Sequence, residues 1–122
     1  MHSSLDTRMG ERLAAYLDLS TAEAKVTAMN MANLDTPGYR TVGFAFEAEM
    51  RSAIRRSDRG QPSRSPQLRE VDGLVARPYG NNVSMEREGL QLAEAQLKSK
   101  TATALLKMEY QKILDAIHAD SK

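Results

Sequence analysis

The sequence predicts a mainly α-helical protein of one structural domain, in which two long terminal helices pair as an antiparallel coiled coil. A short helix and an irregular loop with a possible β-hairpin are expected between them. Three observations predict this fold class. Apolar residues recur at heptad spacing near both ends of the 122-residue chain, aromatic residues make up only 5% of it, and one stretch of the middle is rich in Gly, Pro and Ser. Helices packed on helices suit such a composition better than a mixed core does.

The first long helix is expected from about Leu5 to Asn33. A row of apolar residues at spacings of three, four and three supports it, and Leu13 and Leu17 add a flanking row. The main row consists of Leu19, Ala22, Val26 and Met29. The run from Ser20 to Glu23 resembles a capping box, which leaves a break near Leu19 as an alternative. We favour one continuous helix with a weak point there.

A sharp stop follows, because four residues that disfavour helix fall within six positions: Asn33, Asp35, Pro37 and Gly38. Thr36 precedes a proline, which pushes its backbone toward the extended region. Pro37 fixes its own φ and lacks an N–H, and Gly38 permits a positive φ just beyond it. The chain is therefore expected to leave the helix in a defined direction and to aim Tyr39 at a neighbouring helix or subunit.

The residues around this stop resemble the N-terminal signature of the flagellar basal-body rod, hook and junction proteins, roughly Ala-x-Asn-hydrophobic-Ala-Asn-x-x-Thr-Pro-Gly-Tyr. The matching positions are Ala28, Asn30, Met31, Ala32, Asn33, Thr36, Pro37, Gly38 and Tyr39. We call six of them the signature turn: Asn30, Asn33, Thr36, Pro37, Gly38 and Tyr39. Residues 79–88 are similar to the start of the family's last helix. Within the family, the resemblance is nearest to the proximal rod members.

The middle segment, residues 41–80, is expected to be variable and poor in regular structure. Phe44 to Arg56 predicts a short helix anchored by its few large apolar residues, Phe44, Met50 and Ile54. Residues 57–66 are polar and rich in Gly, Pro and Ser, which is typical of a flexible loop. Residues 68–75 predict a short extended segment with a hairpin-like turn at Asp72-Gly73.

Residues 81–122 predict the second long helix, from about Ser84 to Ala119. Apolar and small residues follow spacings of three and four along it: Leu92, Ala95, Ser99, Ala102, Leu106, Tyr110, Ile113 and Ile117. Glu86 and Glu88 in its first turn suit the helix dipole. Gly89 stands where members of the resembling family usually have a hydrophobic residue. Ser99 stands where many of them have an aromatic one. Together with residues 1–40, this helix completes the pair expected at the two ends of the chain.

The composition argues against an enzyme. The chain has no cysteine, a net charge of +1 and two histidines that lie at opposite ends, His2 and His118. No phosphate-binding loop, nucleophile elbow or zinc motif is present, so no catalytic, cofactor-binding or metal-binding residue is expected. No apolar run approaches the length of a membrane span, and the first residues lack the pattern of a cleaved signal peptide.

One charged cluster stands out in the middle segment: Arg51, Arg55, Arg56, Arg59, Arg64 and Arg69. Three interpretations remain open for it. It solubilises an exposed loop, it contacts an acidic neighbour in an assembly, or it binds nucleic acid. The last is disfavoured because no aromatic residues alternate with the arginines.

The resemblance implies a structural subunit of the flagellar proximal rod, a hollow helical drive shaft that transmits torque and conducts exported subunits. It implies export without a cleaved signal peptide, a periplasmic rod location, and partners among copies of this chain and other rod, MS-ring-adaptor and export-gate proteins. Neither nucleic acid nor direct membrane insertion is expected. The assembly interface is assigned to the apolar rows: Leu19, Ala22, Val26, Met29, Leu92, Leu106, Tyr110, Ile113 and Ile117. The alternative is a small cytoplasmic helical adaptor or export chaperone.

Overall fold

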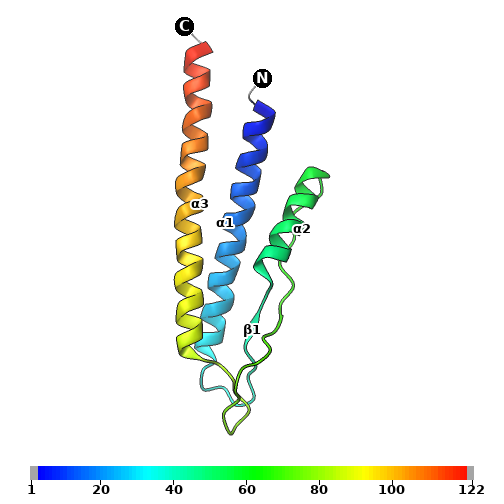
Figure 1. The fold of residues 1–122 in the computed structure, drawn as a ribbon, viewed down its shortest axis with the longest axis vertical. Helices are drawn as coiled ribbons and strands as arrows, with labels where there is room; N and C mark the ends of the chain where they lie inside the picture. Colours follow the sequence, from blue (N-terminus) through cyan, green and yellow to red (C-terminus); the bar gives the residue numbers. More distant parts are fainter. Residues whose placement is uncertain (1–2, 121–122) are drawn as a thin grey trace.

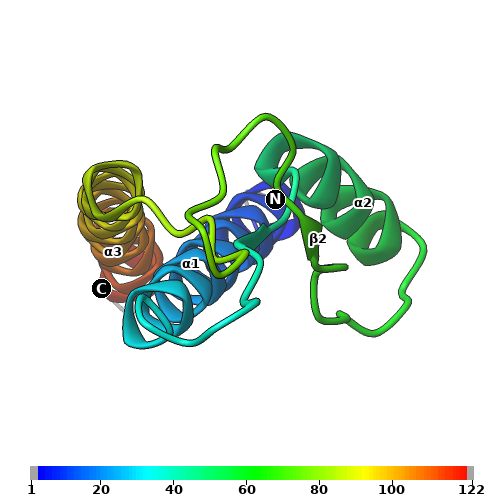
Figure 2. The same cartoon turned by 90° about the horizontal axis from the view of Figure 1, so that it is seen from below.

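The computed structural model describes residues 3–120, with side chains from Arg8 onward. Two long helices dominate it, α1 (Ser3–Ala32) and α3 (Met85–Asp120), and they run antiparallel so that both ends of the chain lie together (Figure 1). A third helix, α2 (Phe46–Asp58), packs on α1. Figure 2 shows α1 between α3 and α2. The mainly helical fold and the pairing of the terminal helices are confirmed.

Helix α1 is continuous, so the alternative break near Leu19 does not occur. The hydroxyl of Ser20 donates a 2.8 Å hydrogen bond to the carbonyl oxygen of Tyr16, four residues earlier. That bond lies within a helix interior, whereas a capping serine accepts from the N–H groups of the following turn. The expected capping box is therefore not formed, and Ser20 is buried within the helical hairpin.

The short helix starts two residues later than expected, at Phe46, and Phe44 lies outside it. Phe46 is the main anchor. Its ring packs edge-on against Tyr16 of α1 with centroids 5.3 Å apart, and the ammonium group of Lys98 from α3 lies 3.8 Å from its centroid. Phe44 instead stacks on Phe46 at 6.3 Å. One aromatic ring thus joins the three helices.

The expected hairpin is wrong. A turn does form at Asp72-Gly73, with Gly73 at φ 81°. However, strand β2 (Arg69–Glu70) pairs antiparallel with strand β1 (Val42–Gly43), far away in sequence, rather than with the residues after the turn. The chain beyond the turn does not pair with β2. Instead, Arg77 donates hydrogen bonds to the carbonyl oxygens of Val83 and Leu34, near the ends of the two long helices.

Buried side chains gather at one half of the helical hairpin. The apolar ones are Leu19, Val83, Ala95 and Ala102, and the polar ones are Ser20, Thr27, Asn30, Thr41, Asn81, Asn82 and Glu88. All of them belong to the half next to the signature turn. Along the other half, residues 8–18 and 103–120 of the described chain, every side chain is exposed or half-exposed. The interior is therefore small, and polar groups make up most of it.

Candidate functional site

The signature turn ends α1 through Asn33. Its side-chain amide donates a 2.8 Å hydrogen bond to the carbonyl oxygen of Met29, and its side-chain oxygen accepts a 3.0 Å bond from the hydroxyl of Thr36. The backbone N–H of Asn33 donates to the same carbonyl of Met29 at 3.2 Å, so both groups of Asn33 bind the last turn of α1. Beyond Pro37, Gly38 has a φ of 74°, the positive value that the sequence predicts.

Asn30 occupies the centre of the site, with only 1% of its surface exposed. Its amide nitrogen donates to the carbonyl oxygen of Val42 (2.8 Å) and to Oε1 of Glu88 (2.7 Å). Its side-chain oxygen accepts from the hydroxyl of Tyr39 (2.9 Å) and from the N–H of Val42 (3.1 Å). An asparagine has two donor hydrogens and two acceptor sites in its side chain, so every one is used. Asn30 thereby connects α1, the turn, β1 and α3.

The buried partner of Asn30 is a charged residue that the sequence assigned to the exposed first turn of α3. Glu88 is fully buried, and its second carboxylate oxygen pairs with the guanidinium of Arg87 at 2.6 Å. A buried carboxylate is tolerated when both oxygens are hydrogen-bonded in this way. Burial and the negative charge of Glu88 raise the pKa of Tyr39 above its ordinary value.

Asn81 reaches back from the segment before α3 to the end of α1. Its amide nitrogen donates to the carbonyl oxygens of Asn33 (2.9 Å) and Thr36 (2.8 Å). Its side-chain oxygen accepts from the N–H of Val83 (2.9 Å) and from Nη2 of Arg77 (2.8 Å). Like Asn30, Asn81 therefore uses both donor hydrogens and both acceptor sites of its side chain, and it connects the backbone of the turn to the segment before α3.

Two further contacts join the same segments. The side-chain oxygen of Asn82 accepts a 2.6 Å bond from the N–H of Thr41. The N–H of Gly38 donates to the carbonyl oxygen of Tyr79 at 2.8 Å. Gly80, at φ 83°, lies beside Gly38, and a Cβ built on it would be in ordinary contact with the Cα of Gly38 at 3.5 Å. The positive φ at both positions, rather than lack of space, is what favours glycine there.

We call this arrangement the polar junction: Asn30, Asn33, Thr36, Gly38 and Tyr39 from the N-terminal part, with Arg77, Gly80, Asn81, Asn82 and Glu88 from the C-terminal part. The structure brings all of the signature turn except the exposed Pro37 into these contacts. Sequence reasoning missed Arg77, Asn81, Asn82 and Glu88 as site residues. For the last three, the similarity of residues 79–88 to a family motif was the available signal, but it gave no partner for any of them; Arg77 lies outside that motif.

The apolar rows expected at an assembly interface are placed unevenly. Leu19 is buried, and half-buried positions are held by Ala22, Val26, Leu92, Leu106 and Ile113. Met29, Tyr110 and Ile117 are 41%, 69% and 56% exposed. Ala95 and Ala102, from the same predicted row, are fully buried. Small residues allow the two helices to approach closely there.

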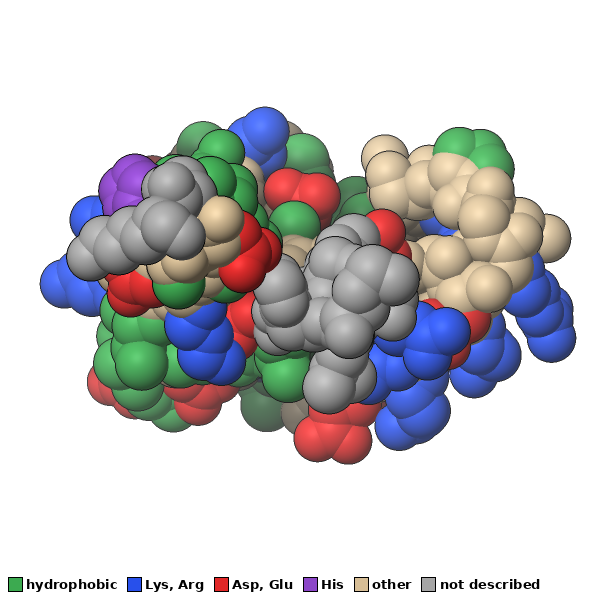
Figure 3. Space-filling model, turned by 90° about the horizontal axis from the view of Figure 1, so that it is seen from above, with side chains coloured by type: hydrophobic (Ala, Val, Ile, Leu, Met, Phe, Trp, Pro, Cys, Tyr) green, Lys and Arg blue, Asp and Glu red, His purple; other side chains and the backbone are tan. Residues whose placement is uncertain are grey.

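Most of the arginine cluster lies on α2 and the loop after it, and Arg69 lies on β2. Figure 3 shows several basic side chains along the α2 side of the molecule, besides those on the α3 side. Arg51, Arg55 and Arg59 are exposed and follow one another at spacings of four residues, so they share one face of the helix end. Arg56 is half-buried and donates to the carbonyl oxygen of Pro62 at 3.3 Å.

Among residues 3–120, no three His, Asp or Glu side chains come together in a way that would hold a metal ion. None of the helices in that range combines the length and the apolar character needed to cross a bilayer.

Replacing Gly38 by valine should destabilise the fold by about 1–3 kcal/mol, because a β-branched residue is strained at positive φ. Its Cβ would meet nothing within 4 Å, so the cost is one of backbone conformation rather than of space. Gly89 is the matched control, since it is helical and its Cβ would also meet nothing. Gly89→Ala should stabilise α3 by about 1 kcal/mol. Urea unfolding followed by circular dichroism measures both, and a stabilising Gly38→Val would contradict the turn geometry.

The chain is similar to three curated relatives, each called flagellar basal body rod protein FlgB. The protein from Borrelia hermsii is 31% identical over 101 residues, which cover 67% of this chain and 75% of the relative. The protein from Salmonella typhimurium is 29% identical over 108 residues, 74% of this chain and 78% of the relative. The protein from Buchnera aphidicola is 23% identical over 113 residues, 80% and 85% of the two chains. No protein-family model matches the chain.

Proposed function

The chain belongs to the family of flagellar basal body rod proteins named FlgB, and on this basis we propose that it is a structural subunit of the proximal rod of a bacterial flagellum. In this proposal, residues 1–40 and 81–122 form the rod, and the middle segment, residues 41–80, lies on its outer side. The hollow rod acts as a drive shaft that transmits torque and as a conduit for exported subunits. The subunit itself reaches the periplasmic rod without a cleaved signal peptide.

The observation that carries the proposal is the polar junction. A rod that transmits torque needs subunits whose two long helices keep a fixed mutual position. Hydrogen bonds are directional, and those of Asn30 with Glu88 and of Asn81 with the turn carbonyls connect the two helices across more than 40 residues of chain. Burial in the junction half protects them from water.

The other half of the helical hairpin supports the second part of the proposal, that the subunit is completed by neighbours. Large apolar side chains are left partly open there, among them Met9 (46% exposed) and Tyr110 (69%). Leu17, Leu106, Tyr110 and Leu114 line a groove between α1 and α3. Burying one such side chain contributes roughly 1.5–3 kcal/mol. Packing against copies of this chain and against other rod, adaptor and export-gate subunits would therefore stabilise the subunit and the assembly.

The test is deletion of the gene in the source bacterium, with the intact gene restored as control. Loss of swimming, and the presence of the protein in purified basal bodies only when the gene is restored, are expected. Normal swimming by the deletion strain, or a protein that stays in the cytoplasm bound to an export substrate, would overturn the proposal. The second outcome would favour the adaptor or chaperone alternative.

A further inference from the structure

Helix α3 carries a second apolar row, apart from the one that contains Ala95 and Ala102. It consists of Leu90, Ala93, Leu97, Ala104 and Met108, and we call it the outer stripe. The spacings are three, four, seven and four residues, as in a heptad seam. All five residues are exposed, and Leu90, Leu97 and Met108 are exposed by 61%, 67% and 61%.

The outer stripe faces away from α1. Ala95 and Ala102 are fully buried on the face that contacts α1. Leu97 follows Ala95 by two residues, and two residues turn a helix by about 200°. A helix with apolar rows on two opposite faces needs two partners, and its own chain supplies one.

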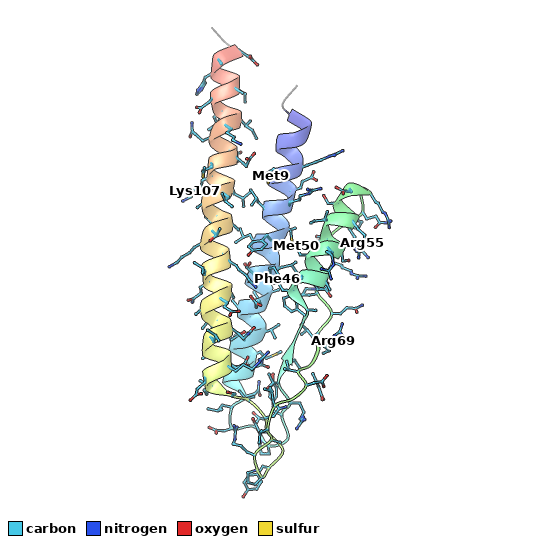
Figure 4. The ribbon with its side chains drawn as sticks, in the orientation of Figure 1. Met9, Phe46, Met50, Arg55, Arg69 and Lys107 are labelled. Carbon is cyan, nitrogen blue, oxygen red and sulfur yellow. The ribbon has the colours of Figure 1, made fainter. Side chains whose placement is uncertain are left out.

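A groove of about 460 Å³ lies between α1 and α2. Its apolar lining comes from Tyr16, Phe46, Met50 and Ile54, and Glu47, Arg51 and Lys98 complete it. Figure 4 shows Phe46 and Met50 between the two helices. Met50 and Ile54 are only half-buried, so the groove can take up apolar side chains.

Both surfaces carry mixed charge, since Glu47 lines the groove with Arg51 and Lys98, and Lys100 lies one helical turn from Leu97. One pair across the two surfaces is of opposite sign. Glu94 is exposed next to the outer stripe, one helical turn from both Leu90 and Leu97. Arg51 is exposed at the groove. Within the described residues neither side chain makes an ion pair. A helix seated by its outer stripe in the groove would bring a carboxylate to an unused guanidinium.

We propose that the outer stripe of α3 docks in the α1–α2 groove of a second copy of this chain, with Glu94 facing Arg51. The two surfaces differ, so each copy offers one and accepts the other, and the contact repeats from copy to copy. The proposal rests on the structural-subunit role proposed above, because it names the partner of a surface that the single chain leaves open. It also assigns Arg51 of the arginine cluster to an acidic neighbour.

Cysteine cross-linking tests the docking directly, since the chain has no cysteine of its own. Purified Leu97→Cys and Met50→Cys proteins are mixed at the highest soluble concentration and oxidised. A covalent dimer is expected in the mixture and not in either protein alone. A dimer formed by Leu97→Cys alone would show that the stripe pairs with itself. Either that result or a yield no higher than for Leu97→Cys mixed with Asp72→Cys, on an exposed turn, would overturn the proposal.

Charge reversal adds a second measurement on the same pair. Glu94→Arg placed in both cross-linking proteins should abolish the dimer, and so should Arg51→Glu. A mixture in which the Leu97→Cys protein carries Glu94→Arg and the Met50→Cys protein carries Arg51→Glu should restore it. If neither reversal changed the yield of the dimer, the assigned contact between Glu94 and Arg51 would be wrong. Circular dichroism confirms beforehand that each variant is as helical as the parent.

Basal bodies separate the failure of this docking from the failure of the proposed function. A variant with both Leu97→Cys and Met50→Cys is expressed in the deletion strain, and basal bodies are purified and oxidised. Oligomers are expected. Basal bodies that contain the protein but yield no cross-link would overturn the docking and leave the rod function in place. If the purified protein were cross-linked but basal bodies contained none of it, the rod function would be overturned and the docking would stand.

Discussion

Asn30→Leu is expected to destabilise the chain by about 3–5 kcal/mol, because several buried polar groups, including one oxygen of a buried carboxylate, would lose a hydrogen bond. Leucine has a similar size but makes none of the four hydrogen bonds of Asn30. Oε1 of Glu88, the hydroxyl of Tyr39 and the backbone N–H and carbonyl of Val42 would each lose a partner. Urea unfolding followed by circular dichroism measures the change in the free energy of unfolding.

Asn33→Leu is the matched control, because Asn33 lies at the end of the same helix but is less buried. It loses the bonds to Met29 and Thr36, and the expected cost is about 1 kcal/mol. Equal effects of the two substitutions would contradict the central role of Asn30. Adding Glu88→Leu to Asn30→Leu should recover part of the loss, since removing both partners leaves fewer unpaired groups.

Ala95→Asp should cost at least about 3 kcal/mol, because it places an unpaired carboxylate where α1 and α3 are in contact. Ala95 has no exposed surface, and the basic side chain one helical turn further along α3, Lys98, is already paired with Glu23. The same unfolding experiment gives the change in stability, and loss of helical signal at room temperature would be an extreme form of the expected result.

Ala93→Asp is the control for this second prediction. It makes the same chemical change two residues away, on the exposed outer stripe, and should alter the stability of the single chain by no more than about 0.5 kcal/mol. If Ala93→Asp were as damaging as Ala95→Asp, the assignment of inner and outer faces to α3 would be wrong.

The helices could be predicted well from the sequence. Heptad spacing and stop signals placed both ends of α1 and α3 within two residues, and the antiparallel pairing followed from the short, turn-rich middle. Burial along the α3 row was harder to predict. Hydrophobic spacing puts Ala95, Ala102, Tyr110 and Ile117 in one row, yet the two alanines are fully buried whereas Tyr110 and Ile117 are exposed. The coiled-coil register stays a prediction.

The polar junction could be predicted only in part. Local backbone rules predicted the positive φ of Gly38 because they need only neighbouring residues. They could not show that Glu88 would be buried, since its partner Asn30 is 58 residues away in sequence. The strand pair was missed for a similar reason. Val42 pairs with Glu70 across α2, whereas a turn signal such as Asp72-Gly73 reports only on its immediate flanks.

The polar junction also closes the middle segment at its base. Thr41 is bound to Asn82, and Gly38 to Tyr79, so the segment leaves and rejoins the helices at one fixed point. The entropy of closing a flexible loop grows slowly, by about 0.6 kcal/mol for each doubling of its length. The segment can therefore lengthen or shorten at small thermodynamic cost while α1 and α3 keep their positions. In evolutionary terms, it is the place where this architecture can accept an inserted domain without changing its helical frame.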